Sequence, residues 1–196
     1  VPKLKELIAA NPDKRLAFFQ GFLRKPQRVG SVVPSSRFLE RRLVSVSAAS
    51  TARTVVELGP GTGGTTRALL RALPREARLL AIEIDPDFAA MLRREIPDPR
   101  LIVERASAED IGALLDRHGL PAPEAVVSGI PFSTMPARTG QAILRAVQAA
   151  LAPLGRFVAY QFRDRVAVLG REILGEPEVD LELLNMPPMH FYCWRK

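Results

Sequence analysis

The segment from Thr54 to Gly63 constrains the fold of this chain more than any other stretch. Its first five residues, Thr-Val-Val-Glu-Leu, have the apolar, β-branched composition of a buried strand, and they run directly into Gly-Pro-Gly-Thr-Gly. A helix-like run from Thr65 to Leu73 follows. Glycine allows the backbone to come close to a ligand, and the N-terminus of a helix offers free amide donors. The segment therefore predicts a strand, a ligand-binding loop and a helix.

The glycine spacing in this loop separates two classes of nucleoside cofactor. The NAD fingerprint has its third glycine three residues after the second, where the pyrophosphate sits on the helix N-terminus. Here the glycines alternate with other residues, and Glu57 precedes them. A carboxylate there repels a pyrophosphate and pairs with the ammonium of a methionine moiety. The spacing favours S-adenosylmethionine, with S-adenosylhomocysteine as product, over NAD; a tight glycine-rich turn in another α/β protein is the alternative.

The next predicted strand ends in acidic residues that suit a ribose. Glu83 and Asp85 lie at the end of the run from Leu79 to Ile84, and a carboxylate can accept hydrogen bonds from both ribose hydroxyls. The two strand ends together supply the predicted cofactor contacts Glu57, Gly59, Gly61, Thr62, Gly63, Glu83 and Ile84.

Strand-like and helix-like segments alternate along the rest of the chain. The predicted strands lie near 54–58, 79–84, 101–104, 124–128 and 156–162, and the predicted helices near 35–49, 65–73, 86–95, 109–117 and 137–151. Short, unbroken apolar strands are typical of a parallel sheet with helices on both faces. Two final strand-like segments, 179–184 and 190–194, are joined by too few residues for a crossover helix and should pair antiparallel. We expect a Rossmann-like α/β domain with a seven-stranded, mainly parallel sheet and an antiparallel last strand.

Positive charge is concentrated in residues 1–53, which hold 11 Lys and Arg against 3 Asp and Glu, a net charge of +8. The whole chain carries +7, so residues 54–196 carry −1. We expect residues 1–53 to form basic amphipathic helices that cover the cofactor at a membrane interface, and residues 54–196 to form the catalytic core. In the helix predicted from Asp13 to Lys25, phenylalanines and leucines share one broad face. Packing of that face on the core, or a merely solvated basic face, are the alternatives.

Composition excludes several other classes. A single cysteine, Cys193, cannot form an internal disulfide, and no apolar run approaches the roughly 20 residues of a membrane span. Two histidines, His118 and His190, and one distant cysteine predict no metal site, and both histidines are expected to be structural. No signal peptide is recognisable. A soluble or peripheral cytoplasmic protein is expected, and the oligomeric state stays open.

Three stretches resemble the bacterial phospholipid N-methyltransferases, which convert phosphatidylethanolamine towards phosphatidylcholine. They are Val29-Gly-Ser-Val-Val-Pro-Ser-Ser36 with the following Arg-Phe-Leu, the motif from Val55 to Gly63 with Ala81-Ile-Glu-Ile-Asp85, and Asn185-Met-Pro-Pro188 before a basic, aromatic strand. The resemblance implies a class I methyltransferase fold and a place on the inner face of the cytoplasmic membrane, with anionic lipids as partners. It also implies cofactor contacts from Gly30, Ser31 and Val33.

The fold and cofactor loop also resemble the ribosomal RNA adenine dimethyltransferases, with departures. Those enzymes carry an Asn-Ile-Pro-Tyr-type motif after the fourth strand, whereas this chain has Gly129 in the Asn position of Ser128-Gly-Ile-Pro-Phe132. They continue into an RNA-binding helical domain, and this sequence ends at Lys196, so nucleic acid is not the expected partner. An acid common after the third strand is replaced by Ser107, so the adenine is expected to contact Ser107, Ala108 and Glu109. A non-catalytic binder of acidic lipid or nucleic acid is a third hypothesis.

The lipid hypothesis assigns roles to further residues. We expect Ser128, Gly129 and Tyr160 at the transferred methyl, with Ser128 also touching the cofactor. Tyr160 or Asp164 is expected to take the ammonium proton, directly or through water. Aromatic rings hold methylated cations and basic side chains hold a lipid phosphate. The predicted substrate contacts are Phe19, Lys25, Arg28, Pro131, Phe132 and Arg163.

Overall fold

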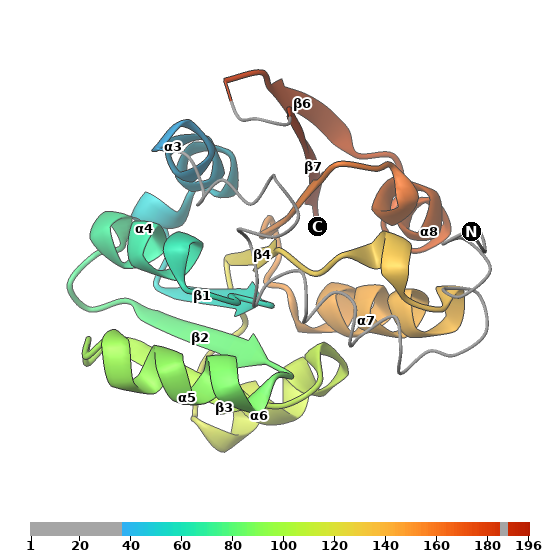
Figure 1. Ribbon diagram of the computed structural model, residues 1–196. Coiled ribbons are helices and arrows are strands. Elements are labelled where there is room, and N and C mark those ends of the chain that lie inside the picture. The colour runs from blue at the N-terminus through green and yellow to red at the C-terminus, as the bar shows by residue number, and fades with distance from the viewer. Residues whose placement is uncertain (1–36, 185–187) are drawn as a thin grey trace, which may run out of the picture.

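The computed structural model describes residues 37–184 and 188–196 (Figure 1). In chain order its elements are α3 (Arg37–Ser47), η2 (Ala49–Thr51), β1 (Thr54–Leu58), α4 (Gly64–Ala72), β2 (Arg78–Glu83), α5 (Pro86–Glu95), β3 (Leu101–Arg105), η3 (Ala108–Asp110), α6 (Ile111–Arg117), β4 (Ala125–Ser128), η4 (Phe132–Thr134), α7 (Ala137–Ala150), β5 (Arg156–Gln161), α8 (Arg165–Leu174), β6 (Glu178–Glu182) and β7 (Met189–Arg195). No helix in these two ranges is long and apolar enough to cross a membrane.

The seven strands form one sheet in the order β3-β2-β1-β4-β5-β7-β6. Neighbours from β3 to β5 pair parallel, and β7 runs antiparallel to both β5 and β6. The sequence-based prediction of a mainly parallel, seven-stranded sheet with an antiparallel last strand is therefore confirmed. The strand order reverses between β1 and β4, and this is where ligands bind in open α/β sheets.

Helices cover both faces of the sheet because its strands are apolar on both sides. Leu43 of α3, Leu69 of α4 and Leu92 of α5 pack against one face. Helices α6, α7 and α8 pack against the other, where Phe157 stacks on Trp194 with ring centroids 5.3 Å apart. Because Leu39 and Leu43 of α3 belong to the core on the first face, with Ala49 and Ala52, residues 37–53 pack as part of the domain. The rest of the predicted N-terminal segment lies outside the described residues.

The main difference from the predicted elements is α8, which sequence reasoning did not identify. Gly170 in its centre lowers helix propensity by about 1 kcal/mol relative to alanine. A Cβ built on Gly170 would lie 3.1 Å from the Trp194 ring, so the glycine lets the helix pack closely on β7. The helix thus depends on a contact with a strand that follows it in the chain. The other elements predicted within the described residues are present, with boundaries shifted by a few residues. The helix predicted from Asp13 to Lys25 lies outside these residues.

Candidate functional site

The predicted acids and the loop after the fourth strand meet at the carboxyl edge of the sheet, around β1 and β4 (Figure 1). Glu57 is paired in register with Ala81 on one side and Val127 on the other. Side chains alternate between the faces of a strand. Glu57, Gly129 and Tyr160 each lie two residues beyond a residue that packs in the core beneath α3 and α4, namely Val55, Val127 and Val158. They therefore share that face of the sheet.

The glycine loop is held in a backbone conformation that other residues rarely adopt. Gly59, Gly61 and Gly63 all have positive φ, at 70°, 56° and 79°. A Cβ on Gly63 would also lie 2.7 Å from Leu92 and 2.9 Å from Ile96, so this glycine is required for space as well as for conformation. Thr62 is exposed between the last two glycines. Without side chains at these three positions, the loop can adopt a conformation in which its backbone approaches a ligand closely, and this role stays a prediction.

Glu83 ties the glycine loop to the end of β2. One carboxylate oxygen accepts from the Gly61 amide at 3.0 Å, and the other accepts from the Asp85 amide at 2.9 Å. Burial raises the pKa of Glu83, and the two amide bonds partly offset that shift. Each carboxylate oxygen has a second lone pair, so the group can still accept from ribose hydroxyls. Asp85 instead caps α5, accepting from the amides of Asp87 at 2.8 Å and Phe88 at 3.2 Å.

Glu57 is 1% exposed and is hydrogen-bonded to the first turn of α4. Thr65 donates to one carboxylate oxygen, and Thr66 donates to the other at 2.6 Å. Burial raises the pKa of Glu57 to about 7, against the lowering effect of these two bonds. Sequence reasoning missed both threonines, although their position directly after the glycines signalled a role. A nearby cation would favour the ionised form of Glu57, as the ammonium of a methionine moiety does.

The loop after β4 is fixed from both sides. Gln161, at the end of β5, donates to the Ile130 carbonyl at 2.7 Å, and the Ser128 hydroxyl accepts from the Ile130 amide at 3.3 Å. The Ser128 side chain is 0% exposed and lies on the face opposite Tyr160, so its hydroxyl orders the turn and is not free to meet a substrate. Phe132 is fully buried in the core under α7, which removes its ring from the predicted head-group contacts. Pro131 is half-buried in this loop.

Tyr160 lies beside Gly129, in the strand that neighbours β4. The register pairs Ser128 with Ala159, so Gly129 and Tyr160 are next to each other one position further along. Thr65 lies close enough to the Tyr160 hydroxyl to lower its pKa, and the Tyr160 ring packs against Phe191 with centroids 6.3 Å apart. Burial raises the pKa of the Tyr160 hydroxyl, and the negative charge of Glu57 adds to the shift. This tyrosine is therefore neutral and does not act as a phenolate.

The predicted adenine and phosphate contacts lie on loops at the same edge. Ile84 is 52% exposed directly after β2 and offers an apolar surface. Ser107 accepts from the Glu109 amide at 3.3 Å and so begins η3, with Ala108 buried and Glu109 exposed. Arg163 is exposed after β5, next to Asp164 at the start of α8. The remaining predicted contacts, Phe19, Lys25, Arg28, Gly30, Ser31 and Val33, lie outside the described residues.

The residues present fit an adenosyl amino acid. Two carboxylates, Glu57 and Glu83, lie at the ends of β1 and β2 next to the glycine loop, and Ile84 presents an exposed apolar side chain beside Glu83. The amino group of such a molecule matches Glu57, its ribose matches Glu83, and its adenine ring matches Ile84. In the described ranges, no cluster of three or more His, Cys, Asp or Glu residues is placed to bind a metal ion.

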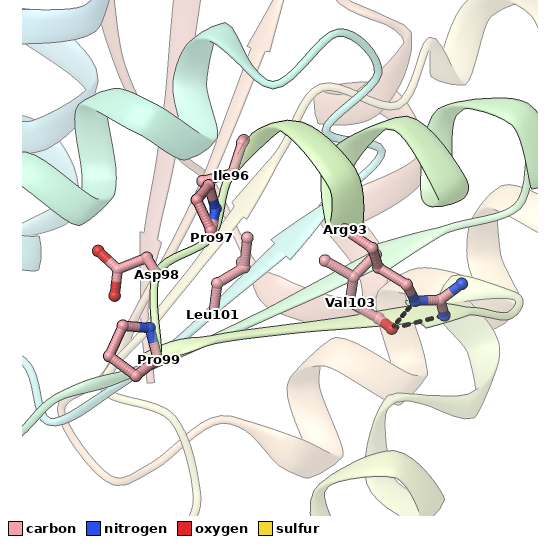
Figure 2. Close-up of a pocket in the computed structure, with 7 residues that line it drawn as sticks. All are labelled: Arg93, Ile96, Pro97, Asp98, Pro99, Leu101 and Val103. Carbon is pink, nitrogen blue, oxygen red and sulfur yellow. Dashed lines mark hydrogen bonds between the residues drawn. The ribbon is translucent and has the colours of Figure 1, made fainter.

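A separate cavity of about 410 Å³ lies at the far edge of the sheet (Figure 2). It is lined by the end of α5, the following turn and β3: Arg93, Ile96, Pro97, Asp98, Pro99, Leu101 and Val103. Arg93 donates twice to the Val103 carbonyl, at 3.2 and 2.7 Å, and so closes one end of it. No predicted site residue lines this cavity.

Comparison with proteins of known sequence identifies relatives of this chain. No protein-family model matches it. An ornithine lipid N-methyltransferase of Singulisphaera acidiphila is 33% identical over 182 residues, which cover 91% of this chain and 94% of that protein. The ribosomal RNA small subunit methyltransferase A of Laribacter hongkongensis is 37% identical over 109 residues, covering 55% of this chain and only 39% of that protein.

Solved structures agree on the fold. The N-methyltransferase NodS from Bradyrhizobium japonicum WM9, in complex with S-adenosyl-L-homocysteine, superposes with a TM-score of 0.72 at 16% identity, over 93% of this chain and 98% of that one. An O-methyltransferase from Bacillus cereus superposes with a TM-score of 0.63 at 15% identity, over 98% of this chain and 95% of that one. With this fold, and a relative that matches along nearly all of both chains, the chain belongs to the S-adenosylmethionine-dependent class I methyltransferases, in the family that contains the ornithine lipid N-methyltransferase.

Proposed function

We propose that this enzyme methylates the head-group amine of a membrane aminolipid, with phosphatidylethanolamine and its methylated forms as substrates on the way to phosphatidylcholine. One observation carries the proposal: the lipid N-methyltransferase covers almost the whole chain, and the ribosomal RNA methyltransferase covers about half of it. The geometry supports it, because the loop at Gly129 has no side-chain amide to hold a planar adenine amine. A flexible aliphatic amine needs no such planar partner.

Each half of the site has its own task. Glu57, Glu83 and the glycine loop would hold the cofactor, which when bound supplies an electrophilic methyl on a sulfonium. The Gly129–Pro131 loop and Tyr160 would hold the amine. An aliphatic amine is mostly protonated near pH 7, and only the neutral form has a nucleophilic lone pair. Burial around Tyr160 favours that neutral form, because desolvation disfavours a cation.

Access from a bilayer is proposed through the N-terminal side of the domain. Arg156, at the start of β5, donates to the Val46 carbonyl near the end of α3 at 2.9 Å. Helix α3 therefore begins towards the carboxyl edge. Phe38 and Phe162 are both about half exposed, and Arg163 follows Phe162. We propose that this end faces anionic lipid on the inner face of the cytoplasmic membrane.

Ornithine lipid is the second candidate substrate, because the relative that matches along most of the chain is named for it. Like phosphatidylethanolamine, it offers a primary aliphatic amine on a membrane lipid. Ribosomal RNA adenine is kept as an alternative because of the partial match. A catalytically inactive methyltransferase fold is disfavoured, since Glu57, Glu83 and all three loop glycines are in place.

Radiolabelled methyl transfer tests these candidates side by side. The purified chain is offered vesicles containing phosphatidylethanolamine, vesicles containing ornithine lipid, and ribosomal RNA, and lipid products are separated by thin-layer chromatography. Label in phosphatidylethanolamine is the expected result, and label only in ornithine lipid would change the substrate and keep the class. Label confined to RNA, or no label despite binding of S-adenosylhomocysteine, would contradict the proposal.

Charge reversal tests the membrane interface. Lys25→Glu with Arg28→Glu should weaken sedimentation with anionic vesicles by roughly 30-fold or more, at about 1 kcal/mol for each basic residue lost. The control replaces two exposed arginines of α7, Arg138 and Arg145, in the same way. Equal losses for both pairs would show non-specific attraction, and no loss for the first pair would remove the N-terminal segment from the interface.

A further inference from the structure

Glycine at position 129 is required by space and not by backbone conformation. Unlike the three glycines of the cofactor loop, Gly129 does not have a positive φ. A Cβ built on it would lie 2.4 Å from the Tyr160 hydroxyl oxygen, 3.0 Å from the Tyr160 ring carbon that bears it, and 3.1 Å from the Gly59 carbonyl oxygen. The Tyr160 hydroxyl therefore occupies the volume that any side chain at 129 would enter.

The Tyr160 oxygen can accept a further hydrogen bond. Thr65, which donates its hydroxyl proton to Glu57, lies close to the Tyr160 hydroxyl and lowers its pKa. A phenol oxygen carries one proton and two lone pairs, so at least one lone pair of Tyr160 stays available beside a contact with Thr65. A donor that reaches this oxygen beside Gly129 would therefore meet an acceptor.

We propose that the Tyr160 hydroxyl, which lies in the space left by Gly129, orients the target amine by accepting a hydrogen bond from one of its N–H groups. This assignment rests on the proposed function, because it requires that the group that receives the methyl is an aliphatic amine. When the amine lone pair points at the transferred methyl, its N–H bonds point away from it. A fixed acceptor beside the Gly129–Pro131 loop then holds the nitrogen at the angle that in-line displacement needs.

This hydrogen bond is available to only some substrates of a methylation series. A neutral primary amine has two N–H bonds, a monomethylated amine has one, and a dimethylated amine has none. Tyr160 can therefore assist the first and second transfers through its oxygen, and it cannot assist the third in this way. Loss of packing around Tyr160 would instead slow all three transfers.

The test compares Tyr160→Phe with the wild type on vesicles containing the unmethylated, monomethylated or dimethylated lipid of whichever aminolipid the wild type methylates. We expect kcat for the first two to fall by about 10- to 100-fold, as when one positioning contact is lost. The rate with the dimethylated lipid and the affinity for S-adenosylhomocysteine in calorimetry should stay unchanged. Tyr192→Phe is the matched control, because its hydroxyl lies on the opposite face of the sheet and its ring is buried in the other core.

Substitution of Gly129 tests the steric half of the assignment. Gly129→Ala should displace the Tyr160 hydroxyl and reduce kcat for the unmethylated lipid as Tyr160→Phe does. The double variant should be no slower than Tyr160→Phe, and thermal melts show whether each variant is folded. Equal losses on all three lipids, or wild-type kcat in Tyr160→Phe, would overturn the assignment and leave the proposed function intact. A folded wild type that binds S-adenosylhomocysteine and methylates no aminolipid would overturn both.

Discussion

The two halves of the site are built by different means. At the ends of β1 and β2, the site is built from short sequence motifs: glycines with positive φ followed by two threonines that bind Glu57, and the carboxylate of Glu83, which accepts hydrogen bonds from the Gly61 and Asp85 amides. At the ends of β4 and β5, it depends on contacts between strands, since Gln161 holds Ile130 and the Tyr160 hydroxyl fills the space above Gly129. The cofactor half can therefore be recognised from a short motif, whereas the acceptor half cannot.

The largest effect is expected in the cofactor half from Glu83→Ala. It removes the acceptor of two buried amides, at Gly61 and Asp85, as well as the proposed ribose contact. Leaving such donors unpaired costs about 1–3 kcal/mol each in stability. Losing hydrogen bonds from the ribose to a charged group costs about 1.5–3 kcal/mol of binding free energy, so affinity for S-adenosylhomocysteine in calorimetry should fall by about 10- to 150-fold. Glu104→Ala, on β3 beside the same strand, is the control and should bind normally. Normal binding of S-adenosylhomocysteine by Glu83→Ala would show that Glu83 does not hold the cofactor in this half of the site.

Glu57→Gln should give a pH-dependent gain in stability. The pKa of Glu57 is raised from 4.5 to about 7 in the folded protein, so the folded state holds its proton more tightly than the unfolded state between these pH values. Wild-type stability is therefore lost as pH rises through this window, and the loss is complete above about pH 7. Relative to wild type, the glutamine variant should gain about 2–3 kcal/mol in free energy of unfolding between pH 5 and pH 8.

Urea unfolding of both proteins at the two pH values measures this difference, and titrations of other groups cancel in the comparison. The same variant should bind S-adenosylhomocysteine less tightly, because it lacks the carboxylate proposed to meet the amino group. A stability difference that does not change with pH would show that Glu57 is already ionised in the folded protein.

The smallest effect is expected from Gln161→Leu in the acceptor half. It removes one neutral hydrogen bond to the Ile130 carbonyl, worth about 1 kcal/mol, so kcat for the lipid should fall by roughly fivefold while cofactor affinity is kept. Gln148→Leu is the matched control, because Gln148 also donates to a backbone carbonyl, that of Ile173, away from the site. A parallel loss of cofactor affinity in Gln161→Leu would mean that the two halves are mechanically coupled.

Much of the fold followed from the sequence. The alternation of apolar strands with helices, and the short connection between the last two strands, predicted the sheet that is found, with boundaries within a few residues. Helix α8 was missed because Gly170 weakens its local pattern, and only the contact with Trp194 explains the glycine. For the site, the predicted cofactor residues Glu57, Glu83 and the loop glycines lie together at the carboxyl edge of the sheet, and their role stays a prediction. Ser128 was predicted at the transferred methyl and Phe132 at the substrate, whereas the Ser128 side chain orders the turn after β4 and Phe132 is buried in the core.

The sequence alone predicted features that depend on residues close together in the chain, and only the tertiary structure revealed features that depend on distant residues. Glu57 and the glycines lie within a few positions of each other, and Glu83 ends the next apolar strand, so the residue order was enough to predict a nucleoside cofactor on an α/β sheet. The role of Gly129 depends on Tyr160, 31 positions later in the chain, which the register of β4 and β5 brings alongside it. Strand pairing creates that contact, and no local pattern encodes it, so only the folded chain could show why position 129 has no side chain.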